Sequence, residues 1–116
     1  MGRIIVATPG TITEEKVPFT FSSGTLTLQS VQQGSVITGA WINITTPFNV
    51  PGALIQLGTT AYPGLVFSSG EVNPLIATKY GAPELIEFAV ADFLLLAVTA
   101  VGATQGAGVL VYQYRR

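Results

Sequence analysis

Short runs in which apolar and polar residues alternate dominate the chain. Around Trp41, the apolar Ile42 and Ile44 are separated by polar positions, and residues 109–114 show the same alternation. A period of two places successive side chains on opposite faces of an extended strand. Pro and Gly turn signals separate these runs throughout the chain, so the pattern predicts an all-β fold.

The runs between the turn signals predict about eight strands. The runs cover residues 3–8, 17–21, 25–31, 36–45, 53–57, 64–67, 84–90, 93–101 and 109–114, and the first of these nine runs could instead belong to an arm. This number of strands in a chain of 116 residues is typical of an antiparallel jelly-roll-like β-sandwich. We expect residues 17–116 to form the sandwich domain and residues 1–16 to form an N-terminal arm or an edge strand.

Two connections near the end of the chain are also predicted. Residues 84–90 and 93–101 are expected to pair as a hairpin, and the glycine-rich residues 102–108 are expected to be a hairpin connection between the last two strands. A buried helix is the alternative for residues 92–101. The strand is favoured because two β-branched residues and a closing Gly102 follow the leucines.

Charged residues are scarce, at 9% of the chain against about 25% in ordinary soluble domains. The formal net charge is -1, and no charged residue lies between Val17 and Gly70. One interpretation is a wet, uncharged surface of Thr, Ser, Gln and Asn. The favoured interpretation is that neighbouring subunits, either copies of this chain or another protein, cover these strands, because solvated strand edges normally carry charges.

The sequence contains no His and no Cys. Imidazole chemistry, thiolate nucleophiles, zinc and iron–sulfur sites and disulfides are therefore excluded. A glycosidase pair formed by two of the acids Glu84, Glu87 and Asp92 is disfavoured, because solvated charges at the rim are the simpler interpretation. Asp92, Glu71 and Asn73 are too few for a calcium loop, and residues 102–108 lack the Lys-Ser/Thr of a phosphate loop. We expect no catalytic residue, no cofactor and no metal site, and therefore no enzyme.

Nucleic acid and membranes are not expected as partners either. A net charge near zero gives no field to hold a phosphate backbone. The most apolar stretch, residues 89–101, is shorter than the roughly 20 residues of a membrane span and contains Asp92. The apolar run at residues 4–7 is too short for a signal-peptide core, so synthesis in the cytoplasm without a signal peptide is expected.

A set of apolar, aromatic and basic residues forms the predicted interface. Its members are Ile4, Ile5, Val6, Trp41, Tyr62, Tyr80, Arg115 and Arg116. The first three would anchor an N-terminal arm that adds a strand to the sheet edge of a neighbour. The two arginines would pair with acids on a neighbour, or they are a solvated end.

For the aromatic residues, core or interface packing is favoured over a sugar-stacking platform, because aromatics supply much of the buried area in small sandwiches. Tyr62 and Tyr80 stand next to glycine turns and are expected in loops. They are the aromatic residues best placed to contact a partner.

Two segments resemble small virion proteins of tailed bacteriophages. Residues 34–49, GSVITGAWINITTPFN, are similar to a strand-and-loop pattern VxxVxVxVTTxFN that leads into a strand ending in Leu-x-x-Gly. Residues 98–114 resemble the closing hairpin of the same proteins. The resemblance covers about residues 31–114.

The resemblance implies a jelly-roll of the kind found in capsid decoration (cement) proteins and in fibre or spike modules. Such decoration proteins sit on the outer capsid surface as dimers or trimers and bind the major capsid protein. The chain departs from the family pattern between Tyr62 and Pro83, where relatives often carry Asp-rich sequence, which weakens any expectation of binding there. The rival hypothesis is a fibre or spike tip or another carbohydrate-binding β-sandwich that contacts a host glycan. It predicts exposed aromatics near Tyr62 and Tyr80, whereas the decoration hypothesis predicts that neighbouring chains cover them.

Overall fold

The computed structural model describes residues 12–82 and 85–115, which form two antiparallel β-sheets and, within these ranges, no helix. The strands are β1 (Thr13–Thr20), β2 (Thr25–Val31), β3 (Val36–Thr46), β4 (Leu54–Thr59), β5 (Lys79–Ala82), β6 (Ile86–Glu87), β7 (Asp92–Thr99) and β8 (Ala107–Arg115). The predicted all-β sandwich of about eight strands is confirmed.

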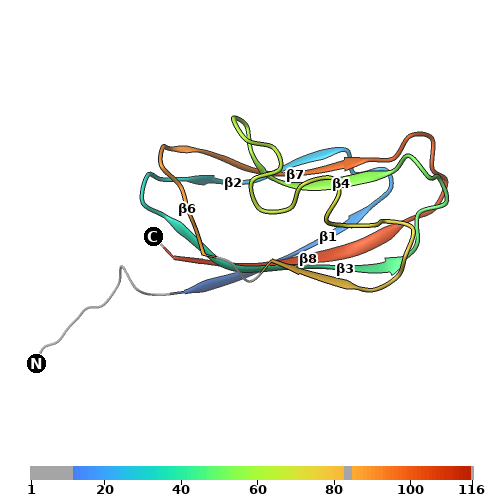
Figure 1. Ribbon diagram of the computed structural model, residues 1–116, viewed down its shortest axis with the longest axis horizontal. Helices are drawn as coiled ribbons and strands as arrows, with labels where there is room; N and C mark the ends of the chain where they lie inside the picture. The colour runs from blue at the N-terminus through green and yellow to red at the C-terminus, as the bar shows by residue number, and fades with distance from the viewer. Residues whose placement is uncertain (1–11, 83–84, 116) are drawn as a thin grey trace, which may run out of the picture.

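The strands pair in a nested order. In the larger sheet the order is β1-β8-β3-β5, with β6 also paired to β3, and in the smaller sheet the order is β2-β7-β4 (Figure 1). The first strand therefore pairs with the last, the second with the seventh and the third with the sixth. This is the arrangement of a long hairpin rolled into two layers, which is a jelly roll.

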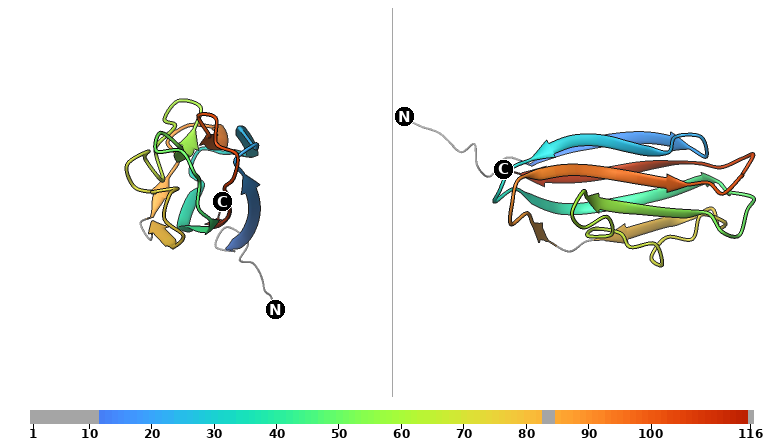
Figure 2. Two further views of the ribbon diagram at one scale, coloured as in Figure 1. Left: turned by 90° about the vertical axis from the view of Figure 1, so that its right-hand side faces the viewer. Right: turned by 90° about the horizontal axis from the view of Figure 1, so that it is seen from above.

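The core lies between the two layers, which are seen end-on in Figure 2. Alternate residues of each strand point into it: Ile42 and Ile44 on β3, Leu94 and Leu96 on β7, and Leu110 on β8 are all at most 1% exposed. Full burial of one such side chain contributes about 1.5–3 kcal/mol. The alternation predicted around Trp41 and in residues 109–114 is therefore confirmed, and it fixes which side chains reach the outside.

The predicted hairpin of residues 84–90 and 93–101 is wrong. β6 pairs with β3 in the larger sheet, whereas β7 lies between β2 and β4 in the smaller sheet. Residues 102–108 likewise connect strands of different sheets and are not a hairpin connection. Both errors have the same cause: in a rolled hairpin, successive strands cross from one layer to the other. The strand prediction for residues 92–101 is confirmed over most of its length by β7.

Three strand assignments also differ from the sequence prediction. Of the strand predicted at residues 84–90, only Ile86–Glu87 (β6) forms a strand among the described residues, because Glu87 already pairs with Val36, the first residue of β3. Residues 64–67 form no strand, although Phe67 makes an isolated antiparallel bridge to Leu57 on β4. Residues 79–82, which were expected to be a loop, form β5. The predicted strand at residues 3–8 lies outside the described residues.

Candidate functional site

The outer face of the larger sheet is organised around Trp41. This residue lies on β3, opposite Gly81 on β5 and Val111 on β8. A Cβ atom added to Gly81 would lie 3.2 Å from Trp41 Cδ1, and one added to Gly39 would lie 2.9 Å from Trp41 Cη2. The indole therefore extends across the sheet surface from one glycine to the other, and a larger residue at Gly39 would displace it.

A shallow depression of about 530 Å³ surrounds the indole. Its lining comes from β1, β3, β5 and β8 and consists of Glu14, Lys16, Trp41, Asn43, Lys79, Val109, Val111 and Gln113. These residues meet because the antiparallel register places alternate residues of the four strands on the same face. The volume is within the range of about 300–1,000 Å³ that is usual for small-molecule sites.

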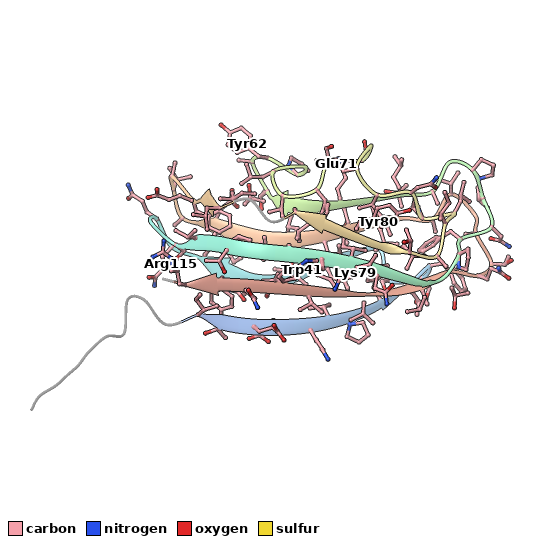
Figure 3. The ribbon with its side chains drawn as sticks, turned by 60° about the horizontal axis from the view of Figure 1, so that its bottom comes forward. Trp41, Tyr62, Glu71, Lys79, Tyr80 and Arg115 are labelled. Carbon is pink, nitrogen blue, oxygen red and sulfur yellow. The ribbon has the colours of Figure 1, made fainter. Side chains whose placement is uncertain are left out.

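The charged and amide groups of this face surround the indole. Lys79 Nζ lies 5.8 Å from the centroid of the Trp41 ring, within cation–π range, and Figure 3 shows both residues on the same face. Gln113 Nε2 donates a hydrogen bond of 3.0 Å to Glu14 Oε1. The carboxylate is thus held by an amide, while Lys16 adds a second positive charge to the lining.

The outer face of the smaller sheet is chemically different. From the register, its outward residues are Thr25, Thr27, Ser30, Leu54, Gln56, Phe93, Leu95, Ala97 and Thr99. Within the described strands β2, β4 and β7, the one ionisable residue is Asp92, at the start of β7. Leu54 is 42% exposed and Phe93 is 52% exposed. We call this surface the uncharged face; it joins the charge-free β2 and β4 to the apolar β7.

The carboxylate of Asp92 fastens the loop that follows β4. It accepts a hydrogen bond of 2.7 Å from its neighbour, the Phe93 amide, and one of 3.2 Å from the Ala61 amide. These bonds, led by the one from Phe93, hold the pKa of Asp92 below its ordinary value of 3.8. Asp92 therefore has a structural role at one end of the uncharged face.

The loop that Asp92 holds carries Tyr62. Tyr62 is 66% exposed, and Figure 3 shows it projecting from the molecule. The backbone of Tyr62 and Pro63 packs directly over Gly58, so a side chain at that position would push the loop away. Tyr62 also lines a small hollow of about 120 Å³ together with Leu65 and Val90. The prediction of a loop position for Tyr62 is confirmed.

The other predicted interface residues are distributed over the molecule. Tyr80 lies on β5 rather than in a loop, is half-buried, and donates a hydrogen bond of 2.9 Å to the Asn73 carbonyl. The loop prediction for Tyr80 is wrong because β5 pairs with β3 there. Arg115 is the last residue of β8, at the end of the sandwich where Figure 3 labels it. The predictions for residues 4–6 and for Arg116 lie outside the described residues.

Tyr112 is a core residue. It is 2% exposed, and its hydroxyl donates a hydrogen bond of 2.7 Å to Gln29 Oε1 on β2. A register shift between Thr27 and Gln29 accompanies this inward amide. Burial, aided by the nearby carboxylate of Glu15, raises the pKa of Tyr112 to about 12. The hydrogen bond between Tyr112 and Gln29 therefore links the larger sheet to the smaller sheet.

Sequence reasoning missed the glycines beneath Trp41 and the companion Lys79. Gly39 was detectable in principle, because it lies two positions before Trp41 and hence on the same face of the strand. Gly81 and Lys79 were not detectable, because their position depends on the pairing of β5 with β3. Of the predicted interface, the residues that the structure describes are not all brought together: Trp41 and Tyr62 lie on different faces of the sandwich (Figure 3).

Among the described residues, no helix is long and apolar enough to cross a membrane. Within the same ranges, no three acidic side chains gather as a metal ion would require.

Comparison with known proteins gives a likeness of fold. No protein-family model matches the chain, and no curated protein matches its sequence. A chain in the acid-stable capsid of Helicobacter pylori bacteriophage KHP30 superposes with a TM-score of 0.71 at 12% identity, over 94% of this chain and 90% of that one. A chain in the capsid asymmetric unit of cyanophage Pam1 gives a TM-score of 0.68 at 14% identity, over 99% of this chain and 91% of that one. The chain therefore has the jelly-roll fold of chains found in two phage capsids.

Proposed function

We propose that this protein is a structural subunit of a bacteriophage capsid, and more specifically a decoration (cement) protein that binds the outside of the shell. The observation that carries the proposal is that the fold match extends over nearly the whole of this chain and nearly the whole of each of the two capsid chains. At least 90% of each chain is matched in both comparisons. The relatives in fold are therefore chains of about this length, each present in a capsid as a complete small sandwich.

The uncharged face supports attachment to other protein subunits. Leu54 and Phe93 are about half exposed on it. Covering the rest of each side chain would contribute about 1 kcal/mol, half of the value for full burial. No charged group of the described strands has to be desolvated in its centre. Such weak contacts become strong when a subunit binds a repeating shell at several points.

The protein would act as a dimer or trimer bound to the major capsid protein, at the capsid surface of the virion. In this arrangement Ile4, Ile5 and Val6 would add an apolar strand to a neighbouring subunit. Arg115 and Arg116 would pair with acids of a neighbour. No catalytic group is needed for this role, because the surface buried between subunits stabilises the shell.

The direct test is binding to capsids that were assembled without this chain, from the phage that encodes it. The purified protein is expected to co-sediment with these shells and to occupy defined positions in their cryo-EM maps. Its mass in solution gives the number of copies in the free oligomer. Failure to co-sediment at micromolar concentration would refute the proposal.

A charge placed on the uncharged face tests which surface attaches. Leu54→Lys would bury an unpaired ammonium in the interface, at a cost of several kcal/mol, and is expected to weaken shell binding more than 100-fold. Thr45→Lys is the matched control, because Thr45 is exposed on β3 at the outer face of the larger sheet. Equal binding by both variants would show that the uncharged face is not the attachment surface.

The contribution of the N-terminal segment is tested by a deletion that stops at residue 11. Residues 13–16 must be kept, because they pair with β8 and are part of the larger sheet. If the segment links neighbouring subunits, the deletion lowers occupancy on the capsid while the isolated sandwich stays folded. Unchanged occupancy would remove the N-terminal segment from the proposal.

A further inference from the structure

We infer that the depression around Trp41 binds an acidic oligosaccharide, that is, a short chain of sugar rings that carries carboxylate groups. This site lies on the face of the sandwich opposite the uncharged face and goes beyond the proposed structural role. Three features carry the inference: the position of the indole, the grid of polar groups around it, and the sign of the charges.

The indole offers a flat apolar surface. Its contacts with the Cβ positions of Gly39 and Gly81 show that it lies across the glycines. Aromatic side chains that cover glycines can stabilise a sheet by themselves, and this accounts for the contact with the glycines. Covering the glycines does not explain why Lys79 lies beside the ring, with its ammonium 5.8 Å from the ring centroid. The ring therefore already attracts a positively polarised group, and the C–H face of a sugar ring is a partner of the same kind.

The polar groups form a regular grid around this surface. One cross-strand row contains Lys16, Val111 and Trp41, and the next contains Val109, Asn43 and Lys79. Strands are about 4.8 Å apart and rows on one face about 6.8 Å apart, so neighbouring groups are spaced closely enough to contact one short ligand together.

The amide groups supply neutral hydrogen bonds. Asn43 is exposed on β3 beside the indole, and Gln113 already binds Glu14 on the other side. Amide groups are suited to sugar hydroxyls because they both donate and accept hydrogen bonds in a plane, and a carboxylate adds further acceptors. The lining thus combines an apolar floor with a few polar groups, as small-molecule sites usually do.

The charges favour an acidic ligand. Lys16 and Lys79 contribute two ammonium groups against one carboxylate, that of Glu14, within the lining. A ligand carboxylate can draw Lys79 away from the indole and leave the ring face free. A protein partner that covered this face would have to desolvate all three charged side chains, which is costly. A saccharide leaves them in contact with water at its edges.

The chain has a single tryptophan, so its fluorescence reports on this site alone. The probes are three acidic oligosaccharides, tetragalacturonic acid, a sialic acid tetramer and a hyaluronan tetrasaccharide. Maltotetraose is the neutral control and oligothymidylate is the control for a generic polyanion. At least one acidic oligosaccharide is expected to change the Trp41 emission saturably, with an affinity that falls as salt rises. The result that overturns the inference is no saturable change with any of the three, or equal affinity for either control.

Substitutions assign the binding to the site. Lys16→Gln and Lys79→Gln are each expected to weaken binding about two- to fivefold, as for exposed charge pairs. Arg115→Gln is the matched control: it removes the same charge from β8, about 13 Å along the strand from Val111. It is expected to leave the affinity for the acidic saccharide unchanged, because Arg115 is not part of the lining of the depression. Equal affinity of the wild-type protein and both lysine variants would overturn the site.

Saccharide binding by Trp41→Leu is measured by calorimetry, because this variant lacks the fluorescent group. The substitution is expected to weaken binding roughly tenfold or more. The lysine variants keep the test valid if this variant folds poorly. The wild-type protein and the Lys16→Gln, Lys79→Gln and Trp41→Leu variants are also tested on capsids. Wild-type protein that binds shells but no acidic saccharide refutes this inference and leaves the proposed function intact. Wild-type protein that binds an acidic saccharide but no shells refutes the proposed function and leaves this inference intact.

Discussion

Gly108 provides a sharp test of the packing between the larger sheet and the core. It lies on β8 opposite Phe19 on β1 and Ile44 on β3. A Cβ atom added at this position would lie 2.6 Å from Phe19 Cζ and 2.7 Å from the Asn43 carbonyl oxygen. The carbonyl belongs to a paired strand, and Phe19 is only 2% exposed, so neither neighbour can move freely.

Gly108→Ala is therefore expected to lower the free energy of unfolding by about 1–3 kcal/mol, the usual cost of overpacking a core. At roughly 4 °C per kcal/mol for a domain of this size, Tm should fall by about 4–12 °C. Urea unfolding followed by Trp41 fluorescence, together with scanning calorimetry, measures both quantities.

Two further variants show whether the stated contact is the cause. Gly39→Ala is the control, because its Cβ would meet only the far end of the Trp41 indole, which can swing aside. It should change the fluorescence with a loss of stability below about 1 kcal/mol. Phe19→Leu combined with Gly108→Ala should cost less than the sum of the two single changes, because the clashing ring atom is removed. A stable Gly108→Ala protein, or strictly additive effects, would refute the reasoning.

Three other predictions concern polar groups. Because burial raises the pKa of Tyr112 to about 12, its contribution to stability is complete below pH 10 and is lost as the pH rises toward 12. The free energy of unfolding should therefore fall less steeply with alkaline pH in Tyr112→Phe than in the wild-type protein. At neutral pH this variant should lose about 1 kcal/mol, because the side-chain amide of Gln29 loses its partner. Because backbone amides lower the pKa of Asp92, its stabilisation holds at neutral pH and is lost as the pH falls below 3.8. The protection of amides in the loop after β4 against hydrogen exchange, measured relative to the intrinsic rate at each pH, should therefore fall in acid in the wild-type protein and be low already at pH 7 in Asp92→Asn. Asn49→Ala breaks two hydrogen bonds to Thr104, of 2.8 and 3.0 Å, and should lower the free energy of unfolding measured in urea by about 1 kcal/mol. Thr104→Val keeps the hydrogen bond that the amide of residue 104 donates to Asn49, so it should lower the free energy of unfolding by about half as much.

The sequence was most informative where a strand has one buried and one exposed face. Residues 25–31 match β2, and residues 36–45 match β3 to within one residue. In both, the alternation of side chains is long enough to be unmistakable. β5 was missed because it has four residues, two of which are Lys79 and Gly81, and such a segment resembles a turn. Its strand conformation depends on the pairing with β3, which local sequence does not specify.

In the candidate sites too, features of a single strand were predictable from the sequence, whereas features that depend on strand pairing were not. Trp41 was included in the predicted interface as an aromatic residue, but the surface around it is built from four strands that are far apart in the sequence. The uncharged character of β2 and β4 was visible directly in the composition. That β7 completes the same face was not visible, because β7 was expected to pair with residues 84–90, whereas it lies between β2 and β4.

The nested pairing of the strands has a consequence for biosynthesis. β8 fills a central position of the larger sheet, between β1 and β3, and joins residues as distant as Thr13 and Tyr114. During translation β8 leaves the ribosome after the other seven strands, so until then β1 and β3 expose unpaired edges. Topologies dominated by such distant partners acquire their native state slowly. We therefore expect the nascent chain to remain open, and prone to aggregation or to chaperone capture, until its eighth strand has emerged.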